Sequence, residues 1–205
     1  MRQELETTSD GSVAMPCLKG QVFLAVTDHV ALEHGRGGYD LLRSTLSPAE
    51  RAEIDAIGWG AWRPFDLWLS LARSAALLFG GSGATDGQLA FIERAGAYGA
   101  ERDLTVMRRL LLRVASPALL IERTASLWAQ FVDVGRLEAQ MVSERRAVAE
   151  IADWPRPEPL LCAMIQGWMR RYLELCGADE VVMVHTECRG RNDATCRWSA
   201  RWRAK

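Results

Sequence analysis

The spacing of apolar residues changes once along this chain, near Phe131, and that change limits the folds open to it. Before this point apolar residues recur at helical spacing, as in Phe65–Phe79, where residues three and four apart share one face. From Phe131 to Met141 the sequence has a period of two, which predicts a strand. Helices followed by strands indicate the α+β class rather than a doubly wound parallel sheet.

The helical part is divided by glycines, prolines and capping residues. Ser47 and Glu50 have the spacing of a capping box, with Pro48 at the first helical position. We predict helices over Gln21–Leu46 (broken at 35–38), Pro48–Ile57, Phe65–Phe79, Thr85–Tyr98, Asp103–Val114 and Pro117–Gln130.

The last third predicts strand, strand, helix, strand, strand. We expect strands over Phe131–Met141, Arg146–Trp154, Val181–Glu187 and Thr195–Trp202, and a helix over Glu158–Cys176. The predicted fold is therefore a helical N-terminal layer packed on a small antiparallel sheet with a C-terminal β-β-α-β-β unit. Residues 1–18 are predicted as a flexible tail or edge strand, and residues 19–205 as a single domain with a helical part at 19–130.

Length and charge exclude some classes of protein. With 205 residues the chain can bury a core without disulfides or metals to support it. A net charge of -1 gives no overall attraction to nucleic acid. Acidic residues stand near the start where a secretory signal needs an apolar core, and no apolar run reaches the ~20 residues of a membrane span. We expect a cytoplasmic protein whose thiols are reduced.

Three cysteines and one histidine near the C-terminus point to definite chemistry. Twenty-two residues separate Cys162 from His185, two separate His185 from Cys188, and seven separate Cys188 from Cys196. Three sulfurs and an imidazole complete a closed tetrahedral zinc shell, so we predict structural zinc that holds residues 131–203 together. Glu187 is an alternative fourth ligand. Buried free thiols, or a disulfide between Cys188 and Cys196, are the other interpretations.

The residues around this cluster resemble a known family. The segment 162–198, with Gly167-Trp168 and the Cys188 to Cys196 spacing, resembles the C-terminal signature of the 4-vinyl reductase domain. That domain shares a superfamily with TRAPP vesicle-tethering subunits and heme nitric-oxide-binding domains. A longer pattern resembles an uncharacterised paralogous family abundant in myxobacteria; it covers 20–38, 46–50, 62–68, 126–128, 131–135 and the C-terminal signature.

The resemblance implies several properties. Residues 19–205 would be one 4-vinyl-reductase-like domain, compact and dimeric. In phenol-responsive activators of this superfamily the matching cysteines bind zinc together with a carboxylate, whose place His185 takes here. The related nitric-oxide sensors bind heme carboxylates through a Tyr-x-Ser-x-Arg motif, of which Tyr98 and Arg102 are present but Ala100 replaces the serine. His29 and His34 are expected to be ordinary helix residues, with heme ligation as the alternative.

These observations favour a non-catalytic regulatory or sensor domain rather than an enzyme. We expect it to contain structural zinc, to bind a small apolar ligand and to signal to a protein partner, without binding nucleic acid. One alternative is a dimeric interaction module without a ligand. Another is an accessory protein for a tetrapyrrole or heme.

Overall fold

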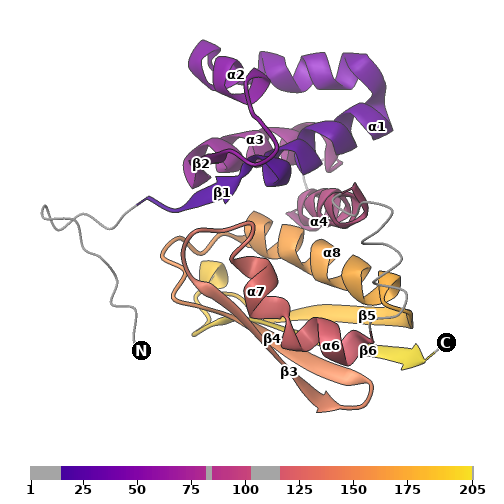
Figure 1. Ribbon diagram of the computed structural model, residues 1–205. Coiled ribbons are helices and arrows are strands. Elements are labelled where there is room, and N and C mark those ends of the chain that lie inside the picture. The colour runs from indigo at the N-terminus through magenta and orange to yellow at the C-terminus, as the bar shows by residue number, and fades with distance from the viewer. Residues whose placement is uncertain (1–14, 82–84, 103–115, 205) are drawn as a thin grey trace, which may run out of the picture.

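The computed structural model of the protein describes residues 15–81, 85–102 and 116–204. It confirms the α+β class: a layer of helices lies above a sheet, with further helices between them (Figure 1). The predicted helix at 103–114 falls outside the described residues. No helix in the described ranges combines the length and the apolar character needed to cross a bilayer.

The helical layer follows the capping and glycine signals of the sequence. Its elements are β1 (Cys17–Lys19), α1 (Gly20–Ser44), α2 (Pro48–Asp55), β2 (Trp62–Pro64), α3 (Phe65–Phe79) and α4 (Thr85–Arg102). Helix α1 bends at Gly35, whose φ of 67° and ψ of -170° suit a residue without a Cβ atom. The capping box between Ser47 and Glu50 is present at the start of α2.

Two predicted element boundaries are wrong, both in the segment that joins the helical layer to the sheet. The single helix expected over Pro117–Gln130 is two short ones, α6 (Pro117–Glu122) and α7 (Thr124–Trp128). The Thr124 hydroxyl donates to the Leu120 carbonyl at 3.2 Å, a local bond of the kind that bends helices. The strand expected from Phe131 begins at Arg136, because Gly135 turns the chain with a φ of 71°.

The C-terminal unit has the predicted order of elements. It consists of β3 (Arg136–Ser143), β4 (Arg146–Ala152), α8 (Pro159–Leu175), β5 (Ala178–Glu187), the 3-10 turn η1 (Arg189–Arg191) and β6 (Cys196–Ala204). The strands form one antiparallel sheet in the order β3-β4-β6-β5. Helices α6, α7 and α8 lie on one face of this sheet, and no helix in the described ranges covers the other face (Figure 1).

The helical layer and the sheet share one apolar core. Phe65 and Trp68 from α3 belong to the same buried cluster as Leu161 from α8 and Trp198 from β6. The centre of this core is the crossing of α4 and α8, where two glycines allow backbone contact. A Cβ atom on Gly96 would lie 2.1 Å from the Met164 carbonyl oxygen, and one on Gly167 would lie 1.8 Å from the Glu93 carbonyl oxygen. The two helices can therefore cross this closely only because both positions are glycine.

Candidate functional site

The four predicted metal ligands meet at one end of the C-terminal unit. Cys162 lies in the first turn of α8, His185 on β5, Cys188 just after β5, and Cys196 at the start of β6. Their ligand atoms all lie within 4.8 Å of one another, and the three cysteines are buried. Glu187, the alternative ligand, is not in this group and instead pairs with Arg197 at 3.5 Å.

The sulfur spacing fits separate thiols rather than a disulfide. The Sγ atoms of Cys162 and Cys188 are 3.9 Å apart, and all the cysteines are free. Metal–sulfur bonds of about 2.3 Å in a tetrahedral site give sulfur–sulfur edges of about 3.8 Å. The geometry therefore has the dimensions of a tetrahedral thiolate site.

Hydrogen bonding within the cluster favours thiolates at two of the three sulfurs. The hydrogen bond from Cys162 is the largest cause that lowers the pKa of Cys188, and also of Cys196, where His185 contributes further. The same bonds raise the pKa of Cys162. A lowered pKa at Cys188 and Cys196 favours the thiolate form, which is the form of cysteine that binds a metal cation.

Two residues that were not predicted from the sequence, Asp193 and Trp198, hold these ligands in place. The carboxylate of Asp193 accepts a hydrogen bond from the Cys188 backbone N–H at 2.7 Å, which closes the turn after β5. The ring of His185 stacks on Trp198 at 4.6 Å between centroids. The sequence contains a signal for each of them. Asp193 lies in a turn, where aspartate commonly bonds the backbone, and Trp198 is an aromatic residue directly opposite His185 on β6.

A small apolar cavity lies deeper in the protein, where α1, α4, α8 and the loop after α7 meet. Its volume is about 60 Å³. Among the described residues that line it, Gln21 carries the one side-chain amide, and its Oε1 atom is buried without a hydrogen-bond partner. The indole Nε1 of Trp168, which also lines the cavity, is likewise buried without a partner in the described ranges. The other lining residues are Leu18, Val22, Ala25, Gly96, Gly99, Trp128, Phe131, Val132, Leu137, Leu161, Met164, Ile165 and Trp168.

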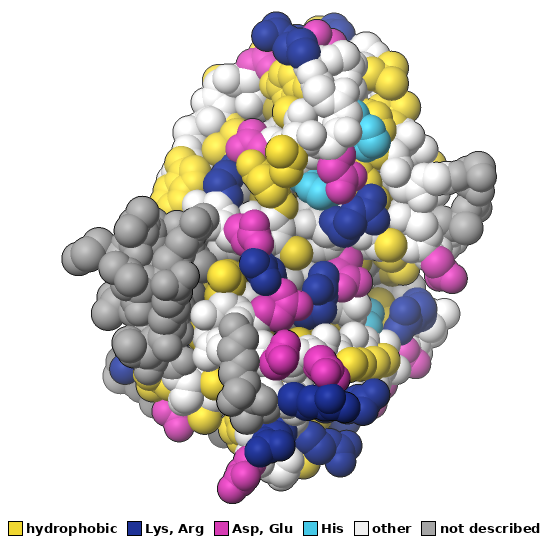
Figure 2. All heavy atoms as spheres, turned by 90° about the vertical axis from the view of Figure 1, so that its right-hand side faces the viewer, with side chains coloured by type: hydrophobic (Ala, Val, Ile, Leu, Met, Phe, Trp, Pro, Cys, Tyr) yellow, Lys and Arg dark blue, Asp and Glu magenta, His cyan; other side chains and the backbone are white. Residues whose placement is uncertain are grey.

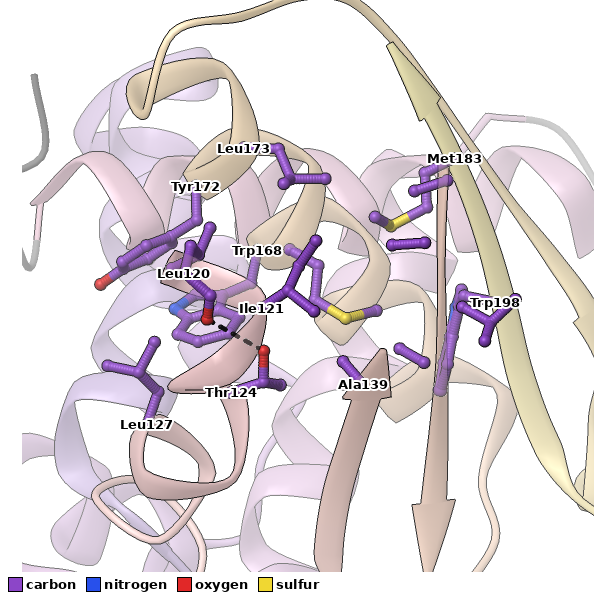
Figure 3. Close-up of a pocket in the computed structure, with 15 residues that line it drawn as sticks. Leu120, Ile121, Thr124, Leu127, Ala139, Trp168, Tyr172, Leu173, Met183 and Trp198 are labelled. Atoms are coloured by element: carbon purple, nitrogen blue, oxygen red, sulfur yellow. Dashed lines mark hydrogen bonds between the residues drawn. The ribbon is translucent and has the colours of Figure 1, made fainter. Parts of the chain in front are cut away.

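A second cavity of about 40 Å³ lies between the α6–α7 segment, α8 and the sheet (Figure 3). Leu120, Ile121 and Leu173 point into it from the two sides, and Met183 and Trp198 enter from the sheet. The Thr124 hydroxyl, one of the polar groups of its lining, is bonded to the Leu120 carbonyl. Trp168 borders both cavities, so its indole separates them.

The histidines on α1 are helix residues packed on aromatic rings, as expected. His29 is buried beside Phe91, with 5.2 Å between ring centroids, and this burial lowers its pKa. His34 stacks on Phe79 at 4.3 Å. Arg102, considered for a heme carboxylate, binds Asp28 at 2.5 Å and the Gln21 carbonyl at 3.2 Å.

Comparison with known proteins identifies the fold. No protein-family model and no curated protein matches the chain. Among solved structures it resembles the H-NOX domain of Shewanella oneidensis in the Fe(II)CO state, with a TM-score of 0.67 and 12% identity over 91% of this chain and 99% of that one. It also resembles the Fe(II) unliganded H-NOX protein of K. algicida, with a TM-score of 0.66 and 11% identity over 91% and 97%. The chain has the H-NOX fold.

Two predictions are corrected by these neighbours. They are H-NOX proteins, the heme nitric oxide/oxygen binding class, so the resemblance to the 4-vinyl reductase domain is wrong. The C-terminal segment 162–198 with its cysteines carried that resemblance. The neighbours are described as Fe(II) forms, and some were solved to study heme distortion. This contradicts structural zinc as the cofactor expected of the fold.

The interior of this chain does not fit the heme that the neighbours imply. The cavity at the layer junction has about 60 Å³, whereas pockets for drug-sized ligands have roughly 300–1,000 Å³. No histidine, cysteine or tyrosine, the usual strong axial ligands, is among its lining residues. The chain has three histidines: His29 and His34 pack on phenylalanine rings, and His185 belongs to the sulfur cluster.

Proposed function

We propose that this protein is a non-catalytic regulatory domain that binds a small apolar molecule in its interior cavity and signals its presence to a protein partner. The observation that carries the proposal is the cavity of about 60 Å³ among α1, α4 and α8, where the two layers of the fold meet. The neighbours support the sensor class, because some of them were solved with the small gases NO or CO bound to Fe(II).

The lining of the cavity indicates the chemistry of the ligand. An empty apolar space deprives its walls of dispersion contacts, which an apolar molecule of matching size restores. Gln21 Oε1 is buried and unpartnered among the described residues, and an unsatisfied buried acceptor costs about 1–3 kcal/mol. The ligand that gains most is therefore a compact apolar molecule with a hydrogen-bond donor for Gln21. An acceptor on the same molecule would also satisfy the Trp168 Nε1–H, which is unpartnered among the described residues.

Xenon provides a test of the cavity, since apolar cavities bind it. In methyl NMR spectra of the whole protein, xenon is expected to shift the methyl signals of Leu161 and Ile165, which line the cavity. Ala25→Val adds methyl groups at the cavity wall and should abolish those shifts. Ala139→Val, a matched change in the second cavity, should leave them unchanged.

Two outcomes would count against the proposal. Xenon could shift only surface methyl groups, which would mean that the cavity is closed to solutes. Alternatively the Leu161 and Ile165 shifts could persist in Ala25→Val, which would place the xenon elsewhere.

We also propose that Cys162, His185, Cys188 and Cys196 bind a thiophilic metal cation. Their ligand atoms lie within 4.8 Å of one another, and His185 Nε2 is buried without a hydrogen-bond partner in the described ranges. A closed set of four ligands leaves no position for a substrate, so this site would link α8 to the β5–β6 hairpin rather than catalyse a reaction.

We propose that residues 19–205 act as one domain, since the core joins both layers. Buried free cysteines suit a cytoplasmic location, where thiols stay reduced. A homodimer remains a second candidate, and Leu32 and Leu77, both 68% exposed on the helical layer, are the side chains that a second copy would cover.

A further inference from the structure

The open face of the sheet carries a patch of two arginines and three valines around one serine. Side chains alternate along β6, so that Trp198, Ala200 and Trp202 are buried while Arg201 points to solvent. The strand pairing places Arg201 between Arg146 of β4 and Val182 of β5. The next row of the same face is Val148, Ser199 and Val184. We call these six residues the outer patch.

The arginines of the outer patch differ from the others on this face. Arg136, Arg197 and Arg203 each have an acidic partner, at 2.6 Å from Asp153, 2.8 Å from Glu150 and 2.8 Å from Glu180. In the described part of the chain, neither Arg146 nor Arg201 has a carboxylate within ion-pair distance. Figure 2 shows basic side chains toward the lower end of the molecule, with acidic side chains among them.

Arg146 and Arg201 are also directly opposite each other across the β4–β6 pairing. Like charges in this position destabilise a sheet, so the isolated domain gains nothing from the pair. The exposed valines beside them add an apolar surface, with Val182 at 41% and Val184 at 49% exposure. A ligand that supplies carboxylates to the arginines and aliphatic groups to the valines would complement both features.

We propose that the outer patch is the docking surface for a protein partner, through an extended segment that presents acidic and aliphatic side chains on the same face. This inference concerns the output of the domain and goes beyond the ligand site proposed above. The partner's carboxylates pair with Arg146 and Arg201, and its aliphatic side chains cover Val182 and Val184. Because the arginines lie in one row across the sheet, the segment runs across the strands.

The same features disfavour other anionic partners. Single-stranded nucleic acid needs aromatic side chains on which bases stack, and the six residues of the outer patch include none. Attraction to anionic lipid usually depends on clusters of about 4–8 basic residues, whereas this patch has two arginines. A protein segment therefore fits the surface best.

The test uses the protein and a short synthetic peptide with the repeat Glu-Glu-Val-Val, here called the Glu-Val peptide, because each face of this extended repeat carries both residue types. The same repeat with Gln in place of Glu, the Gln-Val peptide, is its neutral counterpart. Calorimetry should show binding of the Glu-Val peptide that weakens as salt increases, and no binding of the Gln-Val peptide. Arg201→Glu should reduce the affinity at least about tenfold, as expected when one partner of a charge pair is reversed. Arg36→Glu, at an 88% exposed site on α1, should leave it unchanged.

A second readout separates docking from folding. Arg201→Glu places a carboxylate opposite Arg146, so the variant should have a higher melting temperature while it loses the peptide. Equal binding of both peptides would overturn the proposal, as would equal losses in Arg201→Glu and Arg36→Glu. Tighter binding of an oligonucleotide or of phosphatidylserine vesicles than of the Glu-Val peptide would also overturn it.

Discussion

Gly167→Ala is expected to destabilise the protein by about 3 kcal/mol, the upper part of the range for overpacking a buried site. The added Cβ atom would lie 1.8 Å from the Glu93 carbonyl oxygen and 2.7 Å from its carbonyl carbon. These are backbone atoms of α4, so no side chain can rotate away, and the two helices must separate. Urea unfolding followed by circular dichroism measures the change.

Gly37→Ala is the matched control for this substitution. Gly37 also lies in a helix, but a Cβ atom there would have nothing within 4 Å, and its φ is not positive. Alanine should therefore stabilise this exposed position by up to about 1 kcal/mol, the propensity difference between the two residues. Similar small effects at both glycines would show that α4 and α8 are not in backbone contact.

Cys188→Ala is expected to remove a bound cation and, with it, several kcal/mol of stability. Metal binding to small thiolate sites contributes on the order of 10 kcal/mol, and the loss of one of four ligands opens the shell. In reduced wild-type protein we expect one cation per chain by elemental analysis. Reconstitution with Co²⁺ should give thiolate-to-metal absorption bands that the variant lacks.

Cys176→Ala is the control for the loss of a buried thiol as such. Cys176 is buried at the end of α8, outside the cluster, and burial raises its pKa to about 11. This variant should keep both the cation and the Co²⁺ spectrum. The metal proposal fails if reduced wild-type protein binds no cation, or if the two alanine variants lose it to the same extent.

The sequence predicted the fold class and the cysteine cluster because both depend on local patterns. The change of period near Phe131 separates helices from strands, and Cys188 and Cys196 flank a hairpin turn whose pairing brings them together. The same patterns could not locate the start of β3, where the positive φ of Gly135 overrides the alternation. The same patterns also failed to show that the helix predicted over Pro117–Gln130 is two short helices. The Thr124 hydroxyl bonds the Leu120 carbonyl at the break between them.

The interior cavity could not be predicted, because it depends on contacts between distant segments. Gly96 and Gly167 bring α4 onto α8, and Gln21 and Ala25 approach from α1 at the other side. No period or spacing in the sequence reports this meeting of three helices. The family resemblance, drawn from the C-terminal signature and a longer pattern, named the 4-vinyl reductase domain within a superfamily that includes heme nitric-oxide-binding domains. The structural neighbours are H-NOX proteins instead.

The central claim is that this chain has the H-NOX fold with an interior suited to a small apolar molecule rather than heme. The most direct test is an absorption titration of the protein with hemin in the presence of dithionite, which reduces the iron to Fe(II), with CO added at each step. We predict that the spectrum remains that of unbound heme, because the cavity of about 60 Å³ has no axial ligand among its lining residues. A saturable heme–CO band at one heme per chain would contradict it.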